Sequence, residues 1–416
     1  MSYPANRPQS ALSIDADRLW SRHMELARIG AIGGTGSCRL AMTAEDAQAR
    51  ELLASWCSQA GLDVHVDGAG NMFAVRPGSN PQRLPVASGS HLDTQPHGGR
   101  FDGISGVLAA LEVIETLNDE GITTAAPLAV VNWTNEEGVR YAPGLLGSAW
   151  YAGLLDDEAL ARVKDADGVL FRQEAYERGW LGDSADKFPL GAFLELHIEQ
   201  GPILEREGFQ VGIVTSVQGL RWFDVEVKGT DAHAGTTPLD QRQDALLAAA
   251  RMLVDLNEIG RRYGSSARVS VGRLWTATDG PSTIVGHASF VVDIRHPDAD
   301  TLERLSQECA NACATTGKTF GCEVVVSERI TVPPTVFHDT CVAALERAAE
   351  EQGYSYRRMA SGALHDAANV AKVAPTAMIF VPCRDGISHN VKEYASPEDL
   401  AAGTNVLLHA LLTLAQ

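Results

Sequence analysis

The chain has 416 residues, of which 45% are hydrophobic and 21% charged, a balance typical of globular proteins. Its length predicts two or more domains. The formal net charge of -19 disfavours nucleic acids and anionic membrane surfaces as partners, because both need an excess of Lys and Arg. No apolar run approaches the roughly 18 residues that span a bilayer, and residues 1–20 lack the pattern of a secretory signal. We therefore expect a soluble protein with no membrane partner.

The cysteines indicate a reducing compartment. They are odd in number, scattered, and never form a CxxC pair, so neither a disulfide framework nor a thiolate zinc site is indicated. The seven positions are Cys38, Cys57, Cys309, Cys313, Cys322, Cys341 and Cys383. We expect a cytoplasmic protein.

Residues 44–62 have apolar side chains at helical spacing, with Thr43 placed as N-cap and Gly61 just past the end, and are predicted to form an amphipathic helix. Short β-rich runs then alternate with helical runs as far as residue 138. This rhythm predicts an α/β domain with a mixed, mainly parallel sheet covered by helices. Ligand sites in such sheets usually lie where the strands end.

The middle of the chain has a different pattern. Residues 220–333 follow the order βαββαβ, which is a compact module of the split-βαβ kind. Helix, loop, strand and a final helix from Pro397 come after it. The sequence therefore predicts one catalytic domain built from residues 1–219 and 334–416, with a second domain inserted between them.

Two clusters of candidate metal ligands follow the early strands. His91 and Asp93 end one strand and Asp102 lies in the Gly-rich turn after it, so an imidazole and two carboxylates are grouped. His and carboxylate are the ligands that zinc and manganese accept, and Asp93 is placed to orient the His91 ring. Adjacent Glu136 and Glu137 end the next apolar strand, where one can bind a metal while its neighbour acts as a general base. An exposed acidic turn is the simpler alternative.

Two further histidines complete the set. His197 ends another apolar strand, and His389 lies in the loop after residues 376–382. The candidate ligands are then His91, Asp102, Glu137, His197 and His389, the number expected when one carboxylate bridges two metal ions that each keep an open position. A lone histidine is more often structural, but three at strand ends of one sheet favour a site.

The inserted module holds two less certain candidates. His233 is either an ordinary loop histidine or an oxyanion donor that reaches across a domain or subunit boundary. Arg295 offers a bidentate fork for a substrate carboxylate, and the alternative is a salt bridge with Asp293 or Asp298.

Six segments in chain order carry a family resemblance: GSHLDTQPHGGRFDG (89–103), TNEEG (134–138), ELHIEQGP (195–202), GTDAHAGTTP (229–238), SGALHDA (361–367) and GISHN (386–390). Together they resemble the N-carbamoyl-L-amino-acid amidohydrolases, a family of dinuclear metal hydrolases that includes β-ureidopropionase and allantoate amidohydrolase. The resemblance runs from about Gly70 to about Tyr394 and covers most of the chain.

The resemblance implies a role for individual residues. His91, Asp102 and His197 would hold one divalent ion and Asp102, Glu137 and His389 the other, with Glu136 as the general base. The ions would be Zn or Mn, with Co or Ni also accepted. His233 would be catalytic, and in related dimers its equivalent enters the partner's active site. The substrate contacts implied are Gln200, Gln218, Arg295, Ser282 and Gly362. The inserted module would act as a lid and dimerisation domain.

Two departures from the family pattern affect the substrate pocket. The stretch GPSTIVGH has Ser282 or Thr283 where the family usually has Asn, and SGALHDA has Leu364 where Gly is common.

The expected reaction is metal-dependent hydrolysis of the ureido bond of an N-carbamoyl amino acid, or of N-carbamoyl-β-alanine, to amino acid, ammonia and carbon dioxide. Allantoate hydrolysis, or cleavage of an acyl or peptidyl amide with the same metals, is the alternative. A non-catalytic binding protein of this fold would have lost a ligand or the base, and neither is missing.

Overall fold

The computed structural model describes residues 12–182 and 187–416. Residues 1–11, part of the segment predicted to lack a secretory signal, lie outside this range. The chain forms two compact units: unit 1 contains residues up to Thr215 and from Phe337 to Gln416, and unit 2 is Ser216–Val336. Among the described residues, no helix is long and apolar enough to cross a membrane.

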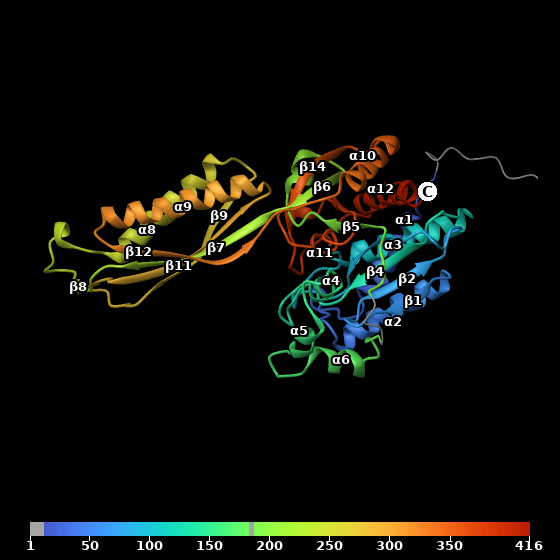
Figure 1. Ribbon diagram of the computed structural model, residues 1–416, viewed down its shortest axis with the longest axis horizontal. Coiled ribbons are helices and arrows are strands. Elements are labelled where there is room, and N and C mark those ends of the chain that lie inside the picture. Colours follow the sequence, from blue (N-terminus) through green and yellow to red (C-terminus); the bar gives the residue numbers. More distant parts are fainter. Residues whose placement is uncertain (1–11, 183–186) are drawn as a thin grey trace, which may run out of the picture. The chain divides into compact units, whose positions relative to one another are not determined.

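Unit 1 is built on the largest sheet (Figure 1), whose strand order is β1-β2-β4-β3-β5-β15-β6-β13, with β14 also paired to β6. Only β13 and the last two residues of β6 fall within the range of unit 2. Its four central strands, β4, β3, β5 and β15, are parallel to one another, and the flanking pairs are antiparallel. The strands are β1 (Asp63–Val66), β2 (Met72–Arg76), β3 (Val86–His91), β4 (Leu128–Trp133), β5 (Ala192–Ile198), β6 (Val211–Val217), β13 (Thr335–Val336), β14 (Tyr356–Ser361) and β15 (Thr376–Val381). The predicted α/β class with a mixed sheet is confirmed.

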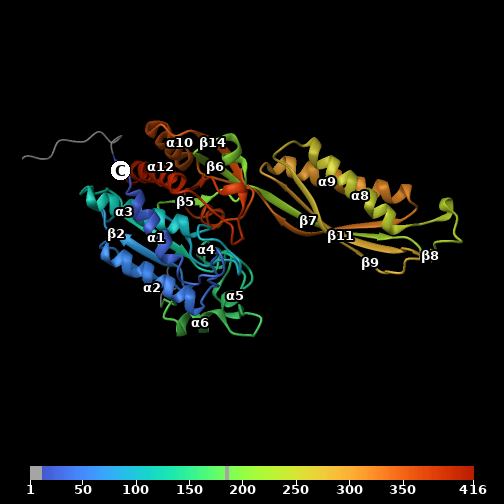
Figure 2. The same cartoon turned by 180° about the vertical axis from the view of Figure 1, so that it is seen from behind.

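Helices cover both faces of the central strands (Figure 2). Alternate residues of β5 point to opposite faces. Leu196 packs against Gly403 of α12, whereas Glu195 accepts a hydrogen bond from the backbone of Ala367 in α11. The helices of unit 1 are α1 (Ala16–Leu26), α2 (Ala44–Gln59), α3 (Ile104–Asp119), α4 (Leu146–Tyr151), α5 (Asp157–Arg162), α6 (Phe171–Glu177), α7 (Ile203–Glu207), α10 (Asp339–Gln352), α11 (Asp366–Val370) and α12 (Pro397–Ala415), with the 3-10 turn η3 (Arg384–Gly386).

The helix predicted after Thr43 illustrates how sequence sets the elements. Thr43 caps α2 by accepting a hydrogen bond from the backbone of Asp46, and Gly61 follows with φ of 79°. A side-chain acceptor at the N-cap satisfies one of the free N–H groups of the first turn, and Gly tolerates the left-handed conformation beyond the last turn. The same logic applies to α12, which Ser396 caps at the expected Pro397.

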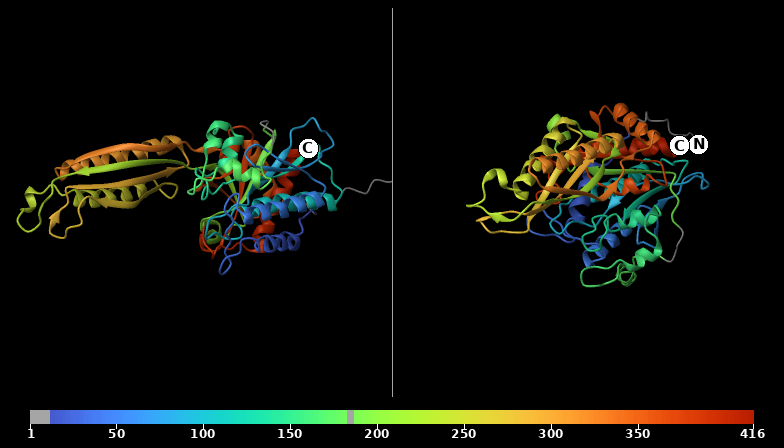
Figure 3. Two further views of the ribbon diagram at one scale, coloured as in Figure 1. Left: turned by 90° about the horizontal axis from the view of Figure 1, so that it is seen from below. Right: turned by 60° about the vertical axis from the view of Figure 1, so that its left-hand side comes forward.

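Unit 2 has a four-stranded antiparallel sheet in the order β12-β7-β11-β9, with α8 and α9 on one face (Figure 3). The helices pack on alternate, inward-pointing strand residues such as Val225, Val227 and Phe290. The short strands β8 and β10, which α8 and β9 separate in the chain, pair as a two-stranded antiparallel sheet. The elements are β7 (Gly219–Lys228), β8 (Ala232–His233), η2 (Leu239–Gln241), α8 (Ala245–Arg262), β9 (Arg268–Thr276), β10 (Thr283–Ile284), β11 (His287–His296), α9 (Ala299–Thr319) and β12 (Glu323–Val332).

Candidate metal centre

The candidate ligands come from all four parallel strands of unit 1. His91 is the last residue of β3, Glu137 follows β4, His197 lies near the end of β5, and His389 follows β15 and η3. Asp102 lies just before α3. Because β4, β3, β5 and β15 are adjacent and parallel, their carboxyl ends meet at one edge of the sheet. The fold therefore brings together side chains that are up to 298 positions apart, from 91 to 389.

Asp102 stands at the middle of this cluster. Its Oδ1 lies 3.1 Å from His197 Nε2 and 3.6 Å from His91 Nε2. Its Oδ2 lies 3.4 Å from His389 Nε2, which is itself 3.5 Å from Glu137 Oε2. The five residues thus form two groups that share Asp102, with ligand atoms close enough in each to surround one cation. This is the arrangement of a bridging carboxylate.

The tautomers of two imidazoles suit metal binding. His91 Nδ1 lies 2.9 Å from the carbonyl oxygen of Asp93, and His197 Nδ1 lies 2.9 Å from that of Ile198. A carbonyl only accepts, so each Nδ1 donates its proton, and the Nε2 of the neutral ring keeps a lone pair that can bind a cation. Donors of this kind beside carboxylates fit Zn or Mn. The residues present therefore fit divalent cations.

The charges around Asp102 give a second argument for a cation. Burial alone would raise the pKa of Asp102, but the imidazoles of His197, His389 and His91 hold that pKa well below its usual range. Burial and nearby carboxylates, first among them Asp366, raise the pKa of Glu136 well above normal. Burial and Asp102 likewise raise the pKa of Glu137 to about 8. Such crowded carboxylates need protons or cations to offset their repulsion.

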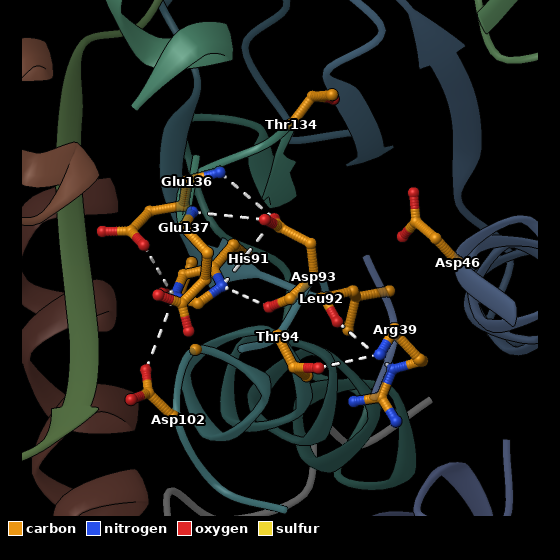
Figure 4. Close-up of polar contacts among 12 residues, drawn as sticks. Arg39, Asp46, His91, Leu92, Asp93, Thr94, Asp102, Thr134, Glu136 and Glu137 are labelled. Atoms are coloured by element: carbon orange, nitrogen blue, oxygen red, sulfur yellow. Dashed lines mark hydrogen bonds and ion pairs between the residues drawn. The ribbon is translucent and has the colours of Figure 1, made fainter. Parts of the chain in front are cut away.

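Glu136 and Glu137 point differently, as adjacent residues in a turn must (Figure 4). Glu136 Oε2 lies 3.6 Å from His91 Nε2, and Glu137 faces His389 and accepts a hydrogen bond from Gln95 Nε2 at 2.6 Å. The turn begins at Asn135, whose φ is 55°. The alternative of an exposed acidic turn is excluded, because the side chains of Glu136 and Glu137 are only 11% and 5% exposed.

Asp93 supports the centre by a different contact from the one expected. Its main-chain carbonyl, rather than its carboxylate, orients His91 at hydrogen-bond distance, and its Oδ1 lies 3.9 Å from the ring. The carboxylate instead accepts hydrogen bonds from the backbone N–H groups of Glu136 and Glu137, both at 3.2 Å (Figure 4). Asp93 therefore joins the loop after β3 to the loop after β4.

Two residues that support the centre, Glu393 and Ser388, were not predicted from the sequence. Glu393 is buried and accepts hydrogen bonds from the backbone of Phe101 and Asp102, at 2.9 and 3.0 Å. Ser388 donates to Asp102 Oδ2 at 2.6 Å. Its position next to His389 is the one signal that could have revealed it. Glu393 lies four residues beyond that histidine, in a loop that carries no periodic pattern.

A third group of possible ligand atoms, from Glu195, His197 and His365, lies deeper in unit 1. Its atoms already have partners. Glu195 accepts from Ser90 Oγ at 2.6 Å and from the backbone of Ala367 at 2.9 Å, and His365 Nε2 lies 3.0 Å from Ser361 Oγ. The His365 and His197 rings pack edge to face with centroids 4.6 Å apart. This group supports His197 from behind rather than forming another cation site.

The predicted substrate contacts are divided between the units. Gln200, with φ of 55°, donates to Asp102 Oδ2 at 2.8 Å, so it contacts a candidate ligand directly. Gly362 lies in the turn between β14 and α11. In unit 2, Gln218 Nε2 donates to the carbonyl of Ser266 at 3.4 Å, and the carbonyl of Ser282 accepts from Ala234 at 2.8 Å.

His233 and Arg295 occupy defined positions within unit 2. His233 Nδ1 accepts from the backbone of Gly235 and Thr236, at 3.0 and 3.2 Å, so in the neutral ring Nε2 carries the proton. The ring is thus fixed as an Nε2–H donor. Arg295 pairs with Asp293 on the same strand, at 2.9 Å from Nε and from Nη2. The salt bridge considered from the sequence is present.

Backbone contact limits the space behind His91. Gly103 has φ of 70°, and a Cβ there would overlap the His91 imidazole. Its N–H also donates to His197 Nε2 at 3.1 Å. The start of α3 therefore packs directly against two imidazoles, which a residue with a side chain would prevent.

The fold and the donor set together define a metal-dependent hydrolase. The sequence matches peptidase family M20/M25/M40 over residues 87–413, and the chain belongs to that family. It is 44% identical over 408 residues to an N-carbamoyl-L-amino-acid amidohydrolase of Rhizobium meliloti, covering 97% of each chain. It is 33% identical over 393 residues to an allantoate amidohydrolase of Bacillus subtilis, covering 94% of this chain and 95% of the other.

The fold is shared with solved structures of the same kind. A hydantoinase/carbamoylase family amidase from Burkholderia multivorans superposes with a TM-score of 0.94 at 45% identity, covering 97% of this chain and 99% of the other. The resemblance described from the six sequence segments is thereby confirmed.

Proposed function

We propose that the protein hydrolyses the ureido C–N bond of N-carbamoyl-L-amino acids. The observation that carries this proposal is the shared Asp102 between two groups of ligands, with Glu136 beside them, in a chain similar over its length to an enzyme of that name. Water adds to the ureido carbonyl carbon and the bond to the amino-acid nitrogen breaks. The carbamic acid formed falls apart to ammonia and carbon dioxide.

Two divalent ions, Zn or Mn with Co or Ni as substitutes, complete the centre in this proposal. His91, His197 and Asp102 would hold one ion, and Asp102, Glu137 and His389 the other. Such ions polarise a carbonyl and lower the pKa of water toward about 7. The fixed Nε2 lone pairs and the repulsion among the buried carboxylates support both positions.

Glu136 is the general base. Its backbone is held by Asp93 and its carboxylate lies beside His91 without belonging to either ligand group. Glu136 takes the proton of the attacking water and delivers it to the leaving nitrogen.

Unit 2 supplies the groups that bind the rest of the substrate. Arg295 would hold the substrate carboxylate through its guanidinium while Asp293 orients it. His233, fixed as an Nε2–H donor, would stabilise the oxyanion. Gln200, Gln218, Ser282 and Gly362 complete the proposed substrate contacts.

The inserted unit would act as a lid whose hinge lies where the chain enters and leaves it. Residues 217 and 335 pair with one another, and Gly219 packs against Pro334. Both connections can thus bend at one place. Small-angle scattering with and without a substrate analogue tests this motion, and identical curves would contradict the lid.

A homodimer formed through unit 2 is part of the proposal. Leu247 and Val254 on α8 are 55% and 50% exposed, and Leu239 just before that helix is 81% exposed. Exposed apolar side chains gathered on one element mark association surfaces. Sedimentation of the wild-type protein tests the dimer.

A cytoplasmic location is supported by the seven cysteines, all of which are free thiols.

The decisive experiment is metal-restored turnover. Metal-stripped protein would receive Zn or Mn in separate samples, and ammonia release would be followed from N-carbamoyl-L-amino acids, N-carbamoyl-β-alanine and allantoate. We expect restored release with the N-carbamoyl-L-amino acids as the best substrates. Preference for allantoate would favour the second candidate, which the similarity to the Bacillus subtilis enzyme supports. Activity on N-acetyl or dipeptide substrates alone would contradict the ureido assignment.

A further inference from the structure

Two arginines with fully buried side chains, Arg39 and Arg50, lie next to the loops that carry the candidate ligands and base. Both precede residue 87, where the match to the peptidase family begins. An interior guanidinium is costly unless its charge is offset and its N–H groups are bonded. The hydrogen-bond partners of these N–H groups therefore show which segments the two side chains fix.

Arg39 fixes the loop that follows β3 (Figure 4). Its Nε donates to the carbonyl of Leu92 at 3.2 Å, between His91 and Asp93. Its backbone N–H donates to Thr94 Oγ1 at 2.8 Å, and the backbone N–H of Thr94 donates back to the carbonyl of Arg39 at 2.9 Å. Nη1 donates to the carbonyl of Ile29 at 2.8 Å and to Ser37 Oγ at 2.5 Å, while Nη2 has no hydrogen-bond partner among the described residues.

Arg50 fixes the loop that follows β4. Its Nη2 donates to Thr134 Oγ1 at 3.1 Å, two residues before Glu136. Its Nε pairs with Asp46 at 2.9 Å, and Nη1 donates to the carbonyl of Gly70 at 2.9 Å. The neighbouring backbone of Met42 also donates to Asp46, at 2.8 Å, so the ion pair is tied to the start of α2.

Asp93 connects what the two arginines hold. It lies between Leu92 and Thr94 in the first loop, and its carboxylate accepts from the backbone of Glu136 and Glu137 in the second. A shift of either loop would therefore move the base and one proposed ligand together with His91. Hydrogen-bonded groups behind metal ligands typically affect metal affinity or activity by 10–100-fold.

We propose that Arg39 and Arg50 are positioning residues of the hydrolytic centre, each fixing one of the two loops that Asp93 joins. This inference rests on the proposed metal centre. It assigns a role in the reaction to residues 39–50, a stretch that lies before the matched segment and contains none of the candidate ligands. The alternative is that both arginines contribute to folding stability alone.

The test compares Arg39→Met and Arg50→Met with Arg76→Met. Arg76 is the control because it makes two side-chain hydrogen bonds in unit 1, yet it pairs with Leu128 at the start of β4, at the other end of that strand. Metal-free protein would be titrated with Co²⁺ and followed by visible absorption, with melting temperature, kcat and KM measured in parallel on an N-carbamoyl-L-amino acid.

We expect Arg39→Met and Arg50→Met to weaken Co²⁺ binding by about 10–100-fold and to lower kcat by a similar factor, with KM changed less than about twofold. Arg76→Met should lower the melting temperature and leave Co²⁺ binding and kcat as in the wild type. Wild-type Co²⁺ affinity and kcat in both variants, with lower melting temperatures, would overturn the inference in favour of stability alone.

Milder variants keep the test usable if the arginine variants do not fold. Thr134→Val removes only the hydroxyl that Arg50 Nη2 binds, and Ser37→Ala only the hydroxyl that Arg39 Nη1 binds. Weaker Co²⁺ binding in both would support the inference, and wild-type binding in both would overturn it. Wild-type protein that binds no Co²⁺ would contradict the metal centre itself, so the two failures can be told apart.

Discussion

In unit 1 the candidate residues meet at the carboxyl ends of four adjacent parallel strands, whereas in unit 2 they are spread over the four-stranded antiparallel sheet and the pair of β8 and β10. Within unit 1 each proposed ligand faces Asp102 directly or across a shared neighbour. Within unit 2, Arg295 pairs with its own strand and His233 with its own turn. The parallel strands bring several side chains together without a bound ligand. In unit 2, Arg295 and His233 are held by residues close to them in the chain, so a functional role there requires a ligand.

The largest effect should come from Glu136→Gln in unit 1. An amide cannot accept the proton of the attacking water, so kcat should fall by about 10³-fold or more. The metal content, measured by atomic emission, should stay at the wild-type level because Glu136 belongs to neither ligand group. A variant that keeps wild-type kcat would remove Glu136 from the role of base.

His233→Ala tests whether unit 2 takes part in the chemistry. Loss of one oxyanion donor typically costs about 10²–10³-fold in kcat. The matched control is His287→Ala, which removes another histidine of unit 2, one that packs against Trp275. If His233 acts across a dimer, mixing inactive Glu136→Gln and His233→Ala proteins should restore part of the activity through mixed dimers. No recovery on mixing, despite subunit exchange, would place His233 in its own subunit or outside the reaction.

Arg295→Met should act on substrate binding. Loss of a charge-assisted pair to a carboxylate costs about 1.5–3 kcal/mol, or roughly 10–100-fold in kcat/KM. The loss should shrink for a substrate amide that lacks the carboxylate, and Asp293→Asn should have a smaller effect than Arg295→Met because the guanidinium remains. Equal losses on the acid and the amide would show that Arg295 serves unit 2 structurally.

The smallest effect concerns the stability of unit 1 rather than turnover. His23 is buried, and burial lowers its pKa from 6.5 to about 4. As the pH falls below 6.5, His23 takes up a proton in the unfolded chain but stays neutral in the folded protein. The contribution of His23 to the free energy of unfolding is therefore lost between pH 6.5 and 4. Between pH 7 and 5 the loss is about 2 kcal/mol.

Urea unfolding at pH 7 and 5 measures this loss. The His23→Gln variant should lose less stability than the wild type over the same interval, because glutamine does not titrate. Equal losses in the two proteins would show that other groups account for the acid sensitivity of unit 1.

Three of the candidate ligands were placed together from sequence because they follow apolar runs, and the end of a buried parallel strand is a position that sequence can locate. His91, His197 and Glu137 all met this condition. The support around them was not predictable in the same way. Arg39 and Glu393 reach the centre from loops with no periodicity, and their contacts exist only once distant segments are packed together.

Asp93 shows the limit most clearly. Its closeness to His91 in sequence indicated a contact, yet which of its oxygens makes that contact depends on the backbone of the turn. The order of strands and helices predicted an inserted module over residues 220–333. The compact unit of the structure is Ser216–Val336, and it includes the pairing of Ser216 and Val217 with residues 335 and 336.

The contact of Gly103 with the His91 ring has a consequence for protein engineering. At Gly103 the surface against the His91 ring is main chain, so no substitution can remove atoms there and any side chain would overlap the imidazole. Attempts to admit bulkier substrates therefore belong in the loop around His389, whose side chain is 49% exposed. Redesign of substrate selectivity should therefore vary the loop around His389 and leave the first turn of α3 unchanged.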